Sequence, residues 1–384
     1  MQPINVLYLV RTWAFGGSHT IVLSLLEHLP RDTVRIRCVP YDAHSPGDAE
    51  FINKAAAHNL SIDNARIPWL SNRDWFQARS VVSSLIHEHN IDLIHTHDPH
   101  SNILVGLGRK RWPVPVIASA YGWWDGPIGR RRLHQRIERD FALPHFDRVI
   151  TVSKNMQHRV LEGRTSPDRV RVVPTGLMPQ NSEISMTFRK HFNIPDTAIV
   201  VGTLGRVSAE KGHRYLLDAV HALRDECPDL YCAIVGTGPA LNALKLQSAK
   251  LGLESRVVFT GFWEDRGDAL NAFDLFALPS TQREGLPTSV LEAQQAGLPV
   301  IASDIGGTAE TIHAGRTGIL VTPANVSTLS AAIRALVSDA EGREAMGKAA
   351  RAWVAERFSM RTMIENISSV YQEAIHEFEN ARSH

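Results

Sequence analysis

Short apolar runs alternate with amphipathic segments along this chain, and the alternation forms two successive series. The first series predicts strands at 4–10, 34–39, 91–95, 114–119 and 147–152. The second series predicts strands at 198–204, 230–235, 256–260, 274–278, 298–302 and 318–321. Segments between the runs, such as 18–29 and 75–89, have helical periodicity. Because the strand runs are too apolar to alternate, they predict parallel sheets that helices cover on both faces.

The two series are separated by the segment 174–197, which is rich in Pro, Gly, Ser and Asn. We therefore predict an N-terminal domain over residues 1–178, a C-terminal domain over 179–358 and one further amphipathic helix at 359–380. The length of 384 residues fits two domains. The predicted fold class is α/β, with two doubly wound, Rossmann-like domains that face each other across a cleft, where a ligand is expected.

Composition narrows the class of protein. Hydrophobic residues make up 43% of the chain and charged residues 21%, which excludes a disordered chain. Three cysteines are too few and too scattered for a disulfide framework or a zinc cluster, and they fit a reducing cytoplasm. No apolar run approaches the roughly 18 residues needed to cross a bilayer. We therefore expect a cytoplasmic protein that at most lies against a membrane surface.

Charge is distributed unevenly along the chain. Residues 1–190 hold 24 Lys and Arg against 17 Asp and Glu, a net charge of +7, whereas the remaining residues carry a net charge of −6. Such asymmetry is typical of an anionic partner on one side, although an accidental surface imbalance explains it equally well. Nucleic acid is not expected, because no recognised nucleic-acid module is present and the whole chain carries only +1.

Two glycine pairs occupy strand-to-helix turns. Gly236 and Gly238 follow a predicted strand and precede a helix, where bare backbone lets a phosphate or a sugar approach the helix N-terminus. The third glycine of the dinucleotide fingerprint is missing, because Leu241 stands in its place, which disfavours a nicotinamide dehydrogenase. Gly16 and Gly17 follow the first predicted strand, and they are explained equally well as a tight turn or as close helix–sheet packing.

The segment GRVSAEKG (205–212) places two permanent cations after a strand. The strand ends at Gly205, and Arg206 and Lys211 lie near the start of the next helix. Arg grips phosphate in a bidentate fork, and Lys adds a compact point charge. The spacing is not that of a P-loop, and a solvated surface is the alternative explanation.

A pair of carboxylates gives the sharpest signal in the chain. Glu284 and Glu292 are separated by seven residues, and on one continuous helix they would lie about 80° apart, a poor shared face. Gly285 and Pro287 indicate instead that Glu284 lies in a loop and that the helix begins near Thr288. Glu292 then lies just over one turn inside that helix.

The opening of this helix offers unpaired backbone donors. The N–H groups of Leu286, Thr288 and Ser289 have no intrahelical partner at this position, so they are available to a diphosphate. Loop carboxylate, helix carboxylate and amides together predict a site for a phosphorylated ligand.

These motifs resemble the family 4 glycosyltransferases, which are retaining enzymes of the GT-B fold. The resemblance covers nearly the whole chain. It is carried by the E-x7-E motif (Glu284 and Glu292), the GRVSAEKG segment, the IVGTGP loop, the SDIGGTAE segment and the N-terminal Gly-Gly pair.

The resemblance implies roles for these residues. Arg206 and Lys211 would neutralise the diphosphate of the donor. Glu292 would bind the nucleoside ribose, and Glu284 would contact hydroxyls of the transferred sugar. Gly16 and Gly17 would border the diphosphate from the other domain, and the helix at 359–384 would pack back on the N-terminal domain.

The N-terminal half supplies candidate acceptor-binding residues. His95, His97 and Asp98 lie at the carboxyl end of a predicted strand, where a histidine can relay a proton or orient a hydroxyl. We expect alternation to place His95 with the core, so His97 is the better candidate, and a packed loop histidine is the alternative. Tyr121 stands where the family often has histidine, and Trp123 follows it.

Basic residues from Arg130 to Arg139 follow these aromatic residues. Aromatic side chains beside cations suit an anionic membrane surface or a lipid diphosphate acceptor. A solvated basic helix is the alternative explanation of the same segment.

The motifs and the resemblance together imply a glycosyltransferase, and the resemblance alone implies that it retains configuration. We expect a UDP-sugar donor and a polysaccharide or lipid-linked glycan acceptor, built at the inner face of the cell membrane. No cofactor is expected, and no metal, since no two Asp residues are separated by a single residue as in metal-dependent transferases of the other main fold. A non-catalytic nucleotide-sugar-binding module, or a GT-B-like epimerase or phosphorylase, remains the alternative.

Overall fold

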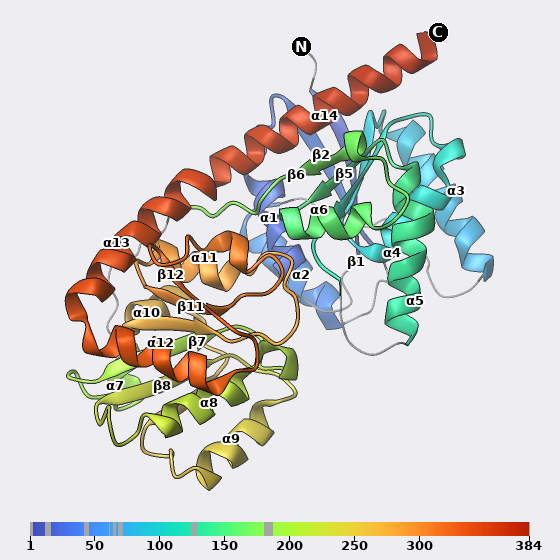
Figure 1. The fold of residues 1–384 in the computed structure, drawn as a ribbon. Helices are drawn as coiled ribbons and strands as arrows, with labels where there is room; N and C mark the ends of the chain where they lie inside the picture. The colour runs from blue at the N-terminus through green and yellow to red at the C-terminus, as the bar shows by residue number, and fades with distance from the viewer. Residues whose placement is uncertain are drawn as a thin grey trace. The chain divides into compact units, whose positions relative to one another are not determined.

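The structure is a computed structural model that describes residues 3–11, 17–41, 46–60, 62–63, 67, 72–123, 129–179 and 187–383. Its internal contacts divide the chain into two units (Figure 1). Unit 1 comprises Met1–Thr175 and Met360–His384, and unit 2 comprises Gly176–Ser359. The sequence predicted the two boundaries between these units at residues 178 and 358. Each unit is built on one parallel sheet covered by helices, which confirms the predicted α/β class.

Unit 1 contains a parallel sheet whose order is typical of doubly wound folds. Across the sheet its strands are β2 (Val34–Tyr41), β1 (Ile4–Arg11), β3 (Leu93–Thr96), β4 (Val116–Ala120), β5 (Arg148–Thr151) and β6 (Val170–Val172). Its α-helices are α1 (Gly17–His28), α2 (Pro46–Ala57), α3 (Asn72–Glu88), α4 (Pro99–Leu107), α5 (Arg130–Ile137), α6 (Lys154–Leu161) and α14 (Met360–Ser383). The direction of winding reverses between β1 and β3. The edge strand β6 was not predicted, because three residues give too short a run.

Both faces of this sheet are buried, and β1 shows how one strand supplies two cores. Val6 and Tyr8 pack with α1, α2 and α14, whereas Leu7 and Leu9 pack with α3, α4 and α6 on the other face. Because successive side chains on a strand point to opposite faces, an uninterrupted apolar run is what such a central strand requires.

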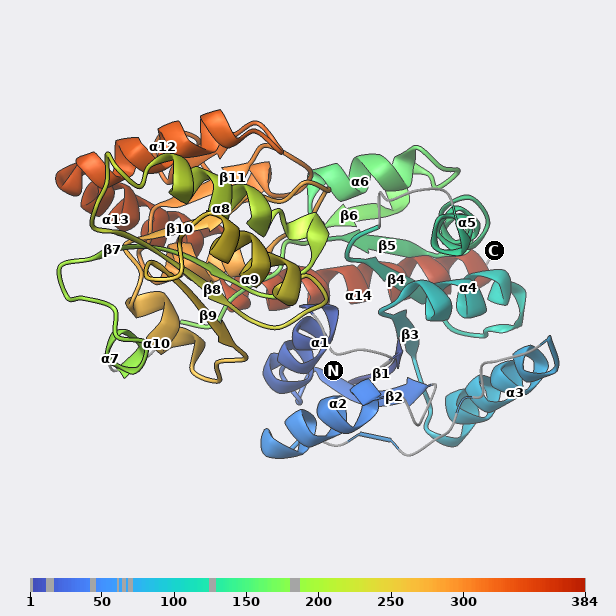
Figure 2. The ribbon, with the colours of Figure 1, turned by 90° about the horizontal axis from the view of Figure 1, so that it is seen from below.

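Helix α14 packs on the sheet of unit 1 although it is the last helix of the chain (Figures 1 and 2). Its apolar face joins the core of β1 and α1. Arg148 of β5, which is buried, forms ion pairs with Glu373 and Glu377 of α14, and Arg171 pairs with Glu373 at 2.9 Å. These contacts tie the C-terminal segment to unit 1.

Unit 2 repeats the architecture with the strand order of a dinucleotide-binding fold. Across the sheet its strands are β12 (Gly318–Val321), β11 (Val300–Ser303), β10 (Leu275–Leu278), β7 (Ile199–Leu204), β8 (Leu230–Val235) and β9 (Val257–Gly261). Its α-helices are α7 (Thr187–His191), α8 (His213–Ala222), α9 (Leu241–Lys250), α10 (Arg266–Asn271), α11 (Thr288–Gln295), α12 (Val326–Ser338) and α13 (Ala340–Arg357). The winding reverses between β7 and β10. Ligands of such sheets bind beyond the carboxyl ends of the strands at this reversal.

Candidate active site

The carboxyl edge of the unit 2 sheet is organised by glycine backbone. Gly236 has φ of +136°, and a side-chain carbon there would overlap the carbonyl oxygen of Gly205. Gly238 lies equally close to the carbonyl of Val207, whose N–H donates to the Thr237 carbonyl at 2.8 Å. Gly236 and Gly238 therefore serve first to pack two loops together. Gly205, at φ +140°, differs because a side-chain carbon there would meet nothing within 4 Å.

A charged pair bridges the loops that follow β7 and β10. The Lys211 ammonium donates to both oxygens of the Glu284 carboxylate, at 2.7 and 2.8 Å, and both side chains are largely buried. Ser280 donates a further hydrogen bond to Glu284 at 2.7 Å. The two residues that the resemblance assigns to different parts of the donor are thus direct partners. They lie at the reversal point of the sheet, where a ligand is expected.

Arg206 is placed differently from Lys211. Its side chain is exposed, and it makes no hydrogen bond or ion pair with any residue that the structure describes. Glu210 lies in the same loop, and the charges of Arg206 and Lys211 contribute to lowering the pKa of its carboxyl group, so these two cations are balanced by Glu210 and Glu284. The exposed guanidinium of Arg206 is nevertheless available to an anion.

Helix α11 begins at Thr288, as predicted, with Pro287 at its N-cap position. The amides of Leu286, Thr288 and Ser289 donate no hydrogen bond within the described ranges of the chain. Gly285 lies in the same loop. An anion at this helix end would meet unpaired N–H groups and the positive end of the helix dipole.

Glu292 lies one turn inside α11 and is mostly buried, with 23% of its side chain exposed. Burial raises its pKa, and the guanidinium of Arg266, which forms an ion pair with it, lowers the pKa in part. Arg266 is the first residue of α10 and was not predicted. Its only sequence signal is its place after a strand, which many surface arginines share.

The segment 304–310 supports the loop that carries Glu284. The Gly307 N–H donates to the carbonyl of Glu284 at 2.9 Å, and Gly306 and Glu284 form a backbone bridge. Gly306 has φ of +59°, and a side-chain carbon there would crowd the Glu284 carbonyl. The two glycines thus hold the loop in place.

At the carboxyl edge of the unit 1 sheet, His95 and His97 are both buried, with 0% and 2% of their surface exposed. Their ring centroids are 4.0 Å apart. The prediction that alternation separates them is wrong, because residues two apart on a strand point to the same face. His97 Nδ1 lies 2.7 Å from the Tyr121 hydroxyl. Burial lowers the pKa of both histidines, that of His95 to about 3, so both rings are neutral.

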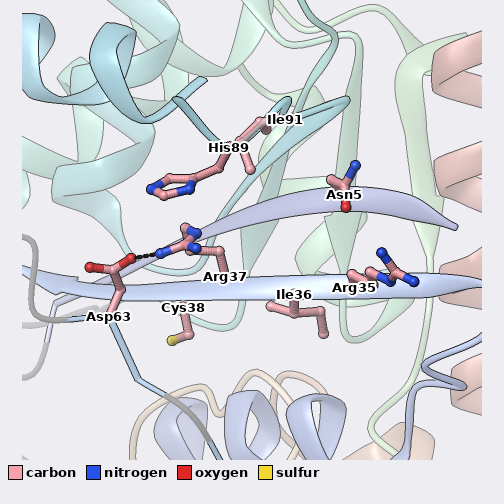
Figure 3. A pocket seen from close by; sticks show the side chains of 8 residues that line it. All are labelled: Asn5, Arg35, Ile36, Arg37, Cys38, Asp63, His89 and Ile91. Carbon is pink, nitrogen blue, oxygen red and sulfur yellow. Dashed lines mark hydrogen bonds and ion pairs between the residues drawn. The ribbon is translucent and has the colours of Figure 1, made fainter. Parts of the chain in front are cut away.

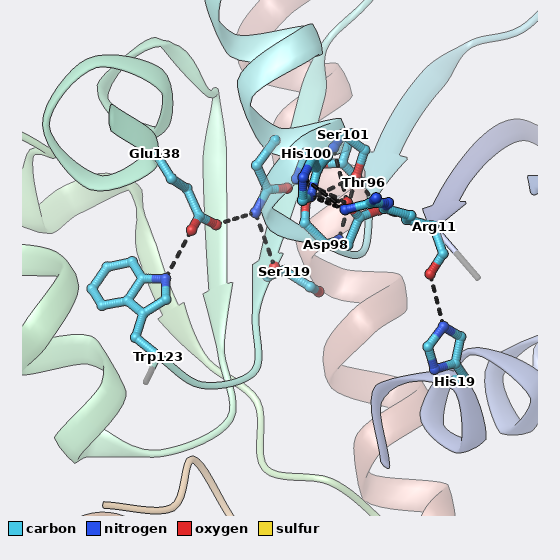
Figure 4. A network of polar contacts seen from close by, with 10 residues as sticks. Arg11, His19, Thr96, Asp98, His100, Ser101, Ser119, Trp123 and Glu138 are labelled. Carbon is cyan, nitrogen blue, oxygen red and sulfur yellow. Dashed lines mark hydrogen bonds and ion pairs between the residues drawn. The ribbon is translucent and has the colours of Figure 1, made fainter. Parts of the chain in front are cut away.

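Asp98 and Trp123 have local partners inside unit 1 (Figure 4). The Asp98 carboxylate caps α4 by accepting from the N–H groups of His100 and Ser101, at 2.8 and 3.0 Å. Trp123 is 6% exposed, and its indole N–H donates to Glu138 at 2.8 Å. The ring of Trp123 therefore belongs to the core of unit 1, and its contact with the acceptor stays a prediction.

The N-terminal glycine pair is described only in part. Gly17 is the first residue of α1, and Gly16 lies outside the described residues. No group of three or more His, Cys, Asp or Glu side chains that could hold a metal ion occurs among the residues with described positions.

A separate hollow of about 260 Å³ lies in unit 1 (Figure 3). It is lined by Asn5, Arg35, Ile36, Arg37, Cys38, Asp63, His89 and Ile91. Asn5 and Arg35 are the second residues of β1 and β2, and Arg37 is paired with Asp63. The hollow contains none of the predicted site residues, and it lies toward the strand ends opposite His97.

Two family models match this chain. The family described as Glycosyltransferase Family 4 matches residues 15–180, and the family described as Glycosyl transferases group 1 matches residues 185–353. Together they cover most of both units, α14 excepted, and the candidate residues of each.

Curated relatives match along almost the full chain. A GDP-mannose-dependent alpha-(1-6)-phosphatidylinositol monomannoside mannosyltransferase of Mycolicibacterium smegmatis is 31% identical over 89% of this chain and 92% of its own length. A D-inositol 3-phosphate glycosyltransferase of Corynebacterium glutamicum is 28% identical over 94% of this chain and 92% of its own.

A solved structure has the same fold. The Anabaena protein Alr3699/HepE, crystallised in complex with UDP, superposes with a TM-score of 0.83 over 96% of this chain and 100% of its own, at 22% identity. This likeness confirms the predicted GT-B fold class. Taken with the family matches and the relative of 31% identity, it shows that the chain belongs to glycosyltransferase family 4 and is a glycosyltransferase that uses a nucleotide-sugar donor.

Proposed function

We propose that the enzyme transfers a mannosyl group from GDP-mannose, with retention of configuration, to a lipid-linked acceptor. The donor is taken from the printed activity of the relative at 31% identity. The UDP-sugar of the sequence analysis is the second candidate, and the Anabaena complex with UDP supports it through the fold alone. Retention follows from the family resemblance.

The observation that carries the proposal is the charged cluster at the reversal point of the unit 2 sheet. Breaking a sugar–phosphate bond leaves negative charge on the departing diphosphate. Arg206, the remaining N–H of Lys211 and the amides that open α11 are the donors available to stabilise this charge. Glu284 holds the Lys211 ammonium in place, and Glu292 offers a carboxylate to ribose hydroxyls.

The donor is tested with a panel of GDP-, UDP- and ADP-sugars, by calorimetry and by hydrolysis of the sugar nucleotide. We expect GDP-mannose to bind and to be slowly hydrolysed, and Glu292→Ala to weaken its binding at least tenfold. Lys250→Ala removes an exposed lysine from α9 and is the matched control for the variant Lys211→Ala. The control should bind and hydrolyse the donor as the wild type does. Binding of no sugar nucleotide, or equal binding by Glu292→Ala, would remove the proposal.

We also propose that turnover requires no metal ion. The positive charge that a metal ion would supply to the diphosphate is already present on Arg206 and Lys211. Activity that is unchanged by a chelator supports the proposal, and activity lost on chelation and restored by a divalent ion contradicts it.

The acceptor side of the proposal rests on the surface around α5. Arg131, Arg132 and Arg136 are exposed there, beside Leu133 with 61% and Phe141 with 51% of its surface exposed. A hollow of about 500 Å³ nearby is lined by Leu133, Arg136, Ile137, Arg139, Asp140, Phe141, Glu162, Gly163 and Arg164. Apolar side chains among arginines are typical of surfaces that bind anionic lipid headgroups. None of the helices in the described ranges is long and apolar enough to cross a membrane.

Flotation with liposomes tests this surface. Anionic vesicles should retain the protein at low salt and release it at high salt, because exposed charges are screened. Leu133→Ser combined with Phe141→Ser should abolish retention, whereas Phe76→Ser, which removes a side chain of similar exposure from α3, should not. Equal retention on neutral vesicles would show that the basic surface does not recognise anionic lipid.

A further inference from the structure

The chain passes between the two units twice, at residues 175–176 and at residues 359–360. Just inside unit 2 the two passages are joined to each other. Leu177 and Ser359 form a parallel backbone bridge, and the Leu177 N–H donates to the Phe358 carbonyl at 2.7 Å. We call residues 176–178 and 358–359 the linker pair. Because the covalent chain joins the units at these two points, any movement of one unit against the other bends the linker pair.

The linker pair shares a small apolar cluster with α11 and with the loop that precedes this helix. The cluster consists of buried and partly buried side chains, namely Leu177, Leu286, Leu291, Trp353, Val354 and Phe358. A second contact lies at the other end of α11, where the side-chain amide of Gln295 donates to the Met178 carbonyl at 2.6 Å. The linker pair therefore contacts α11 near its start and at its last residue.

Leu286 connects this cluster with the turn that offers amides to an anion. Its side chain packs in the cluster, whereas its N–H has no acceptor among the described residues. The same loop carries Glu284, whose carboxylate binds Lys211. Because side chains in an apolar cluster are close-packed, a shift of Leu177 changes the space available to Leu286, and with it the position of the Leu286 amide.

The α13 side of the cluster is fixed by hydrogen bonds. The indole N–H of Trp353 donates to the Thr311 carbonyl at 3.1 Å. The guanidinium of Arg351 donates to the carbonyls of Gln295 and Ala296, at 3.1 and 2.7 Å. Helix α13 is thus held against α11 and does not readily absorb a displacement. A displacement of the linker pair is therefore passed to the loop of Leu286.

We propose that Leu177 and Phe358 are positioning residues, which set the opening turn of α11 and thereby couple the binding of a diphosphate at this turn to the conformation of the linker pair. The choice of a diphosphate as the ligand rests on the proposed function. Such coupling is reciprocal. A diphosphate that fixes the turn also fixes the linker pair, and a loosened linker pair weakens diphosphate binding by the same factor.

The variants that test the coupling change the linker pair and leave the charged residues of the site intact. Leu177→Ala removes most of a partly buried side chain, whereas Leu177→Met keeps nearly the same volume. Leu251→Ala is the matched control, because Leu251 is a partly buried leucine that packs on a different apolar cluster of unit 2. A general loss of packing would affect Leu177→Ala and Leu251→Ala alike.

Calorimetry with GDP, and with pyrophosphate as a smaller probe, measures the first side of the coupling. We expect Leu177→Ala to raise the Kd for each probe about fivefold, and Leu177→Met and Leu251→Ala to stay within about twofold of the wild type. Hydrogen exchange followed by mass spectrometry measures the reciprocal side. Either probe should slow exchange in the wild-type peptide that contains the Leu177 amide, as well as in the peptide that contains residues 286–289.

Equal affinities of Leu177→Ala and the wild type, or an equal loss in Leu251→Ala, would overturn the inference. Exchange at Leu177 that a probe leaves unchanged while it protects residues 286–289 would do the same, and this measurement decides the matter if Leu177→Ala does not fold. The proposed function fails separately. Coupling seen with pyrophosphate in a protein that binds no sugar nucleotide would keep the inference and remove the transferase site, whereas hydrolysis of GDP-mannose without coupling would do the opposite.

Discussion

The carboxyl edges of the two sheets hold polar groups in opposite ways. In unit 1 the two histidines are neutral and buried against tyrosine hydroxyls, His95 against Tyr371 and His97 against Tyr121. In unit 2 the polar groups are charged and lie in loops, as in the pair of Lys211 with Glu284. Folding pairs most of the groups in unit 1 but leaves His97 Nε2 without a partner among the described residues. In unit 2 the exposed guanidinium of Arg206 and the unpaired amides of α11 are completed by an anion, which is the expected behaviour of a leaving-group site.

The largest expected effect tests the charged edge. Lys211→Ala should lower kcat/KM by roughly 100- to 1000-fold, the loss typical of one donor to a developing anion. It also leaves the Glu284 carboxylate largely buried without its cation, which should destabilise unit 2 by about 3 kcal/mol. Steady-state kinetics and urea unfolding measure the two effects.

The double variant Lys211→Ala with Glu284→Gln separates these roles. Because Gln carries no charge at position 284, the free energy of unfolding should return toward that of the wild type while kcat/KM stays low. Recovered activity would mean that Lys211 serves only as the counter-ion of Glu284.

The buried polar groups of unit 1 are tested by the dependence of the free energy of unfolding on pH, to which Glu138 contributes. Burial raises the pKa of this carboxyl group from 4.5 to about 7, although hydrogen bonds from Asn102 and Trp123 oppose the shift. The folded protein therefore keeps a proton between pH 4.5 and 7 that the unfolded chain releases. The resulting stability is complete below pH 4.5 and is lost as the pH rises to 7, by about 3 kcal/mol in total.

Urea unfolding of the wild type and of Glu138→Gln at pH 5, 6 and 7.5 measures this. The wild type should lose stability relative to the variant as the pH rises. Buried histidines shift both proteins alike, so they cancel in the difference. If the free energies of unfolding of the two proteins change with pH in parallel, Glu138 is ionised in the folded protein.

Two glycine substitutions separate loop packing from ligand access at the charged edge. Gly236→Ala combines a positive φ with overlap on the Gly205 carbonyl, so it should destabilise unit 2 by about 3 kcal/mol. Gly205→Ala meets open space and should cost about 1–2 kcal/mol from its φ alone. Activity at a temperature where both variants are folded should fall further in Gly205→Ala. If activity falls further in Gly236→Ala than in Gly205→Ala, the ligand lies away from Gly205.

The smallest effect concerns Arg266. Its guanidinium lowers the pKa of Glu292, which burial raises. Arg266→Ala should therefore raise that pKa further, and the acidic limb of donor binding should move to higher pH. Calorimetry between pH 5.5 and 8 detects the shift, with Arg224→Ala, an exposed arginine remote in sequence, as the control. An unmoved limb would indicate that Glu292 does not bind the donor as a carboxylate.

Much of the architecture could be predicted from local pattern. The uninterrupted apolar runs located both sheets, and Gly285 with Pro287 located the start of α11 at Thr288. The charged residues of unit 2 were found because they cluster in short motifs. β6 escaped because it is three residues long at an edge.

Errors arose where a side chain depends on distant partners. Trp123 looked like a surface aromatic beside arginines, yet its indole reaches Glu138. His95 and His97 were assigned to different environments, yet their rings lie together. The ion pair of Arg266 with Glu292 joins helices α10 and α11, which no local pattern connects.

The sequence by itself determined the class of fold, the order of its elements and the family, because hydrophobic periodicity and short glycine and carboxylate motifs are local properties. Only the tertiary structure decided which charges pair, which glycines pack and which are open, and how Tyr371 of α14 reaches His95. Those outcomes depend on burial and on contacts between residues hundreds of positions apart, such as Tyr8 and Tyr371. Their energies come from desolvation and hydrogen bonding in the folded core, which no single segment contains.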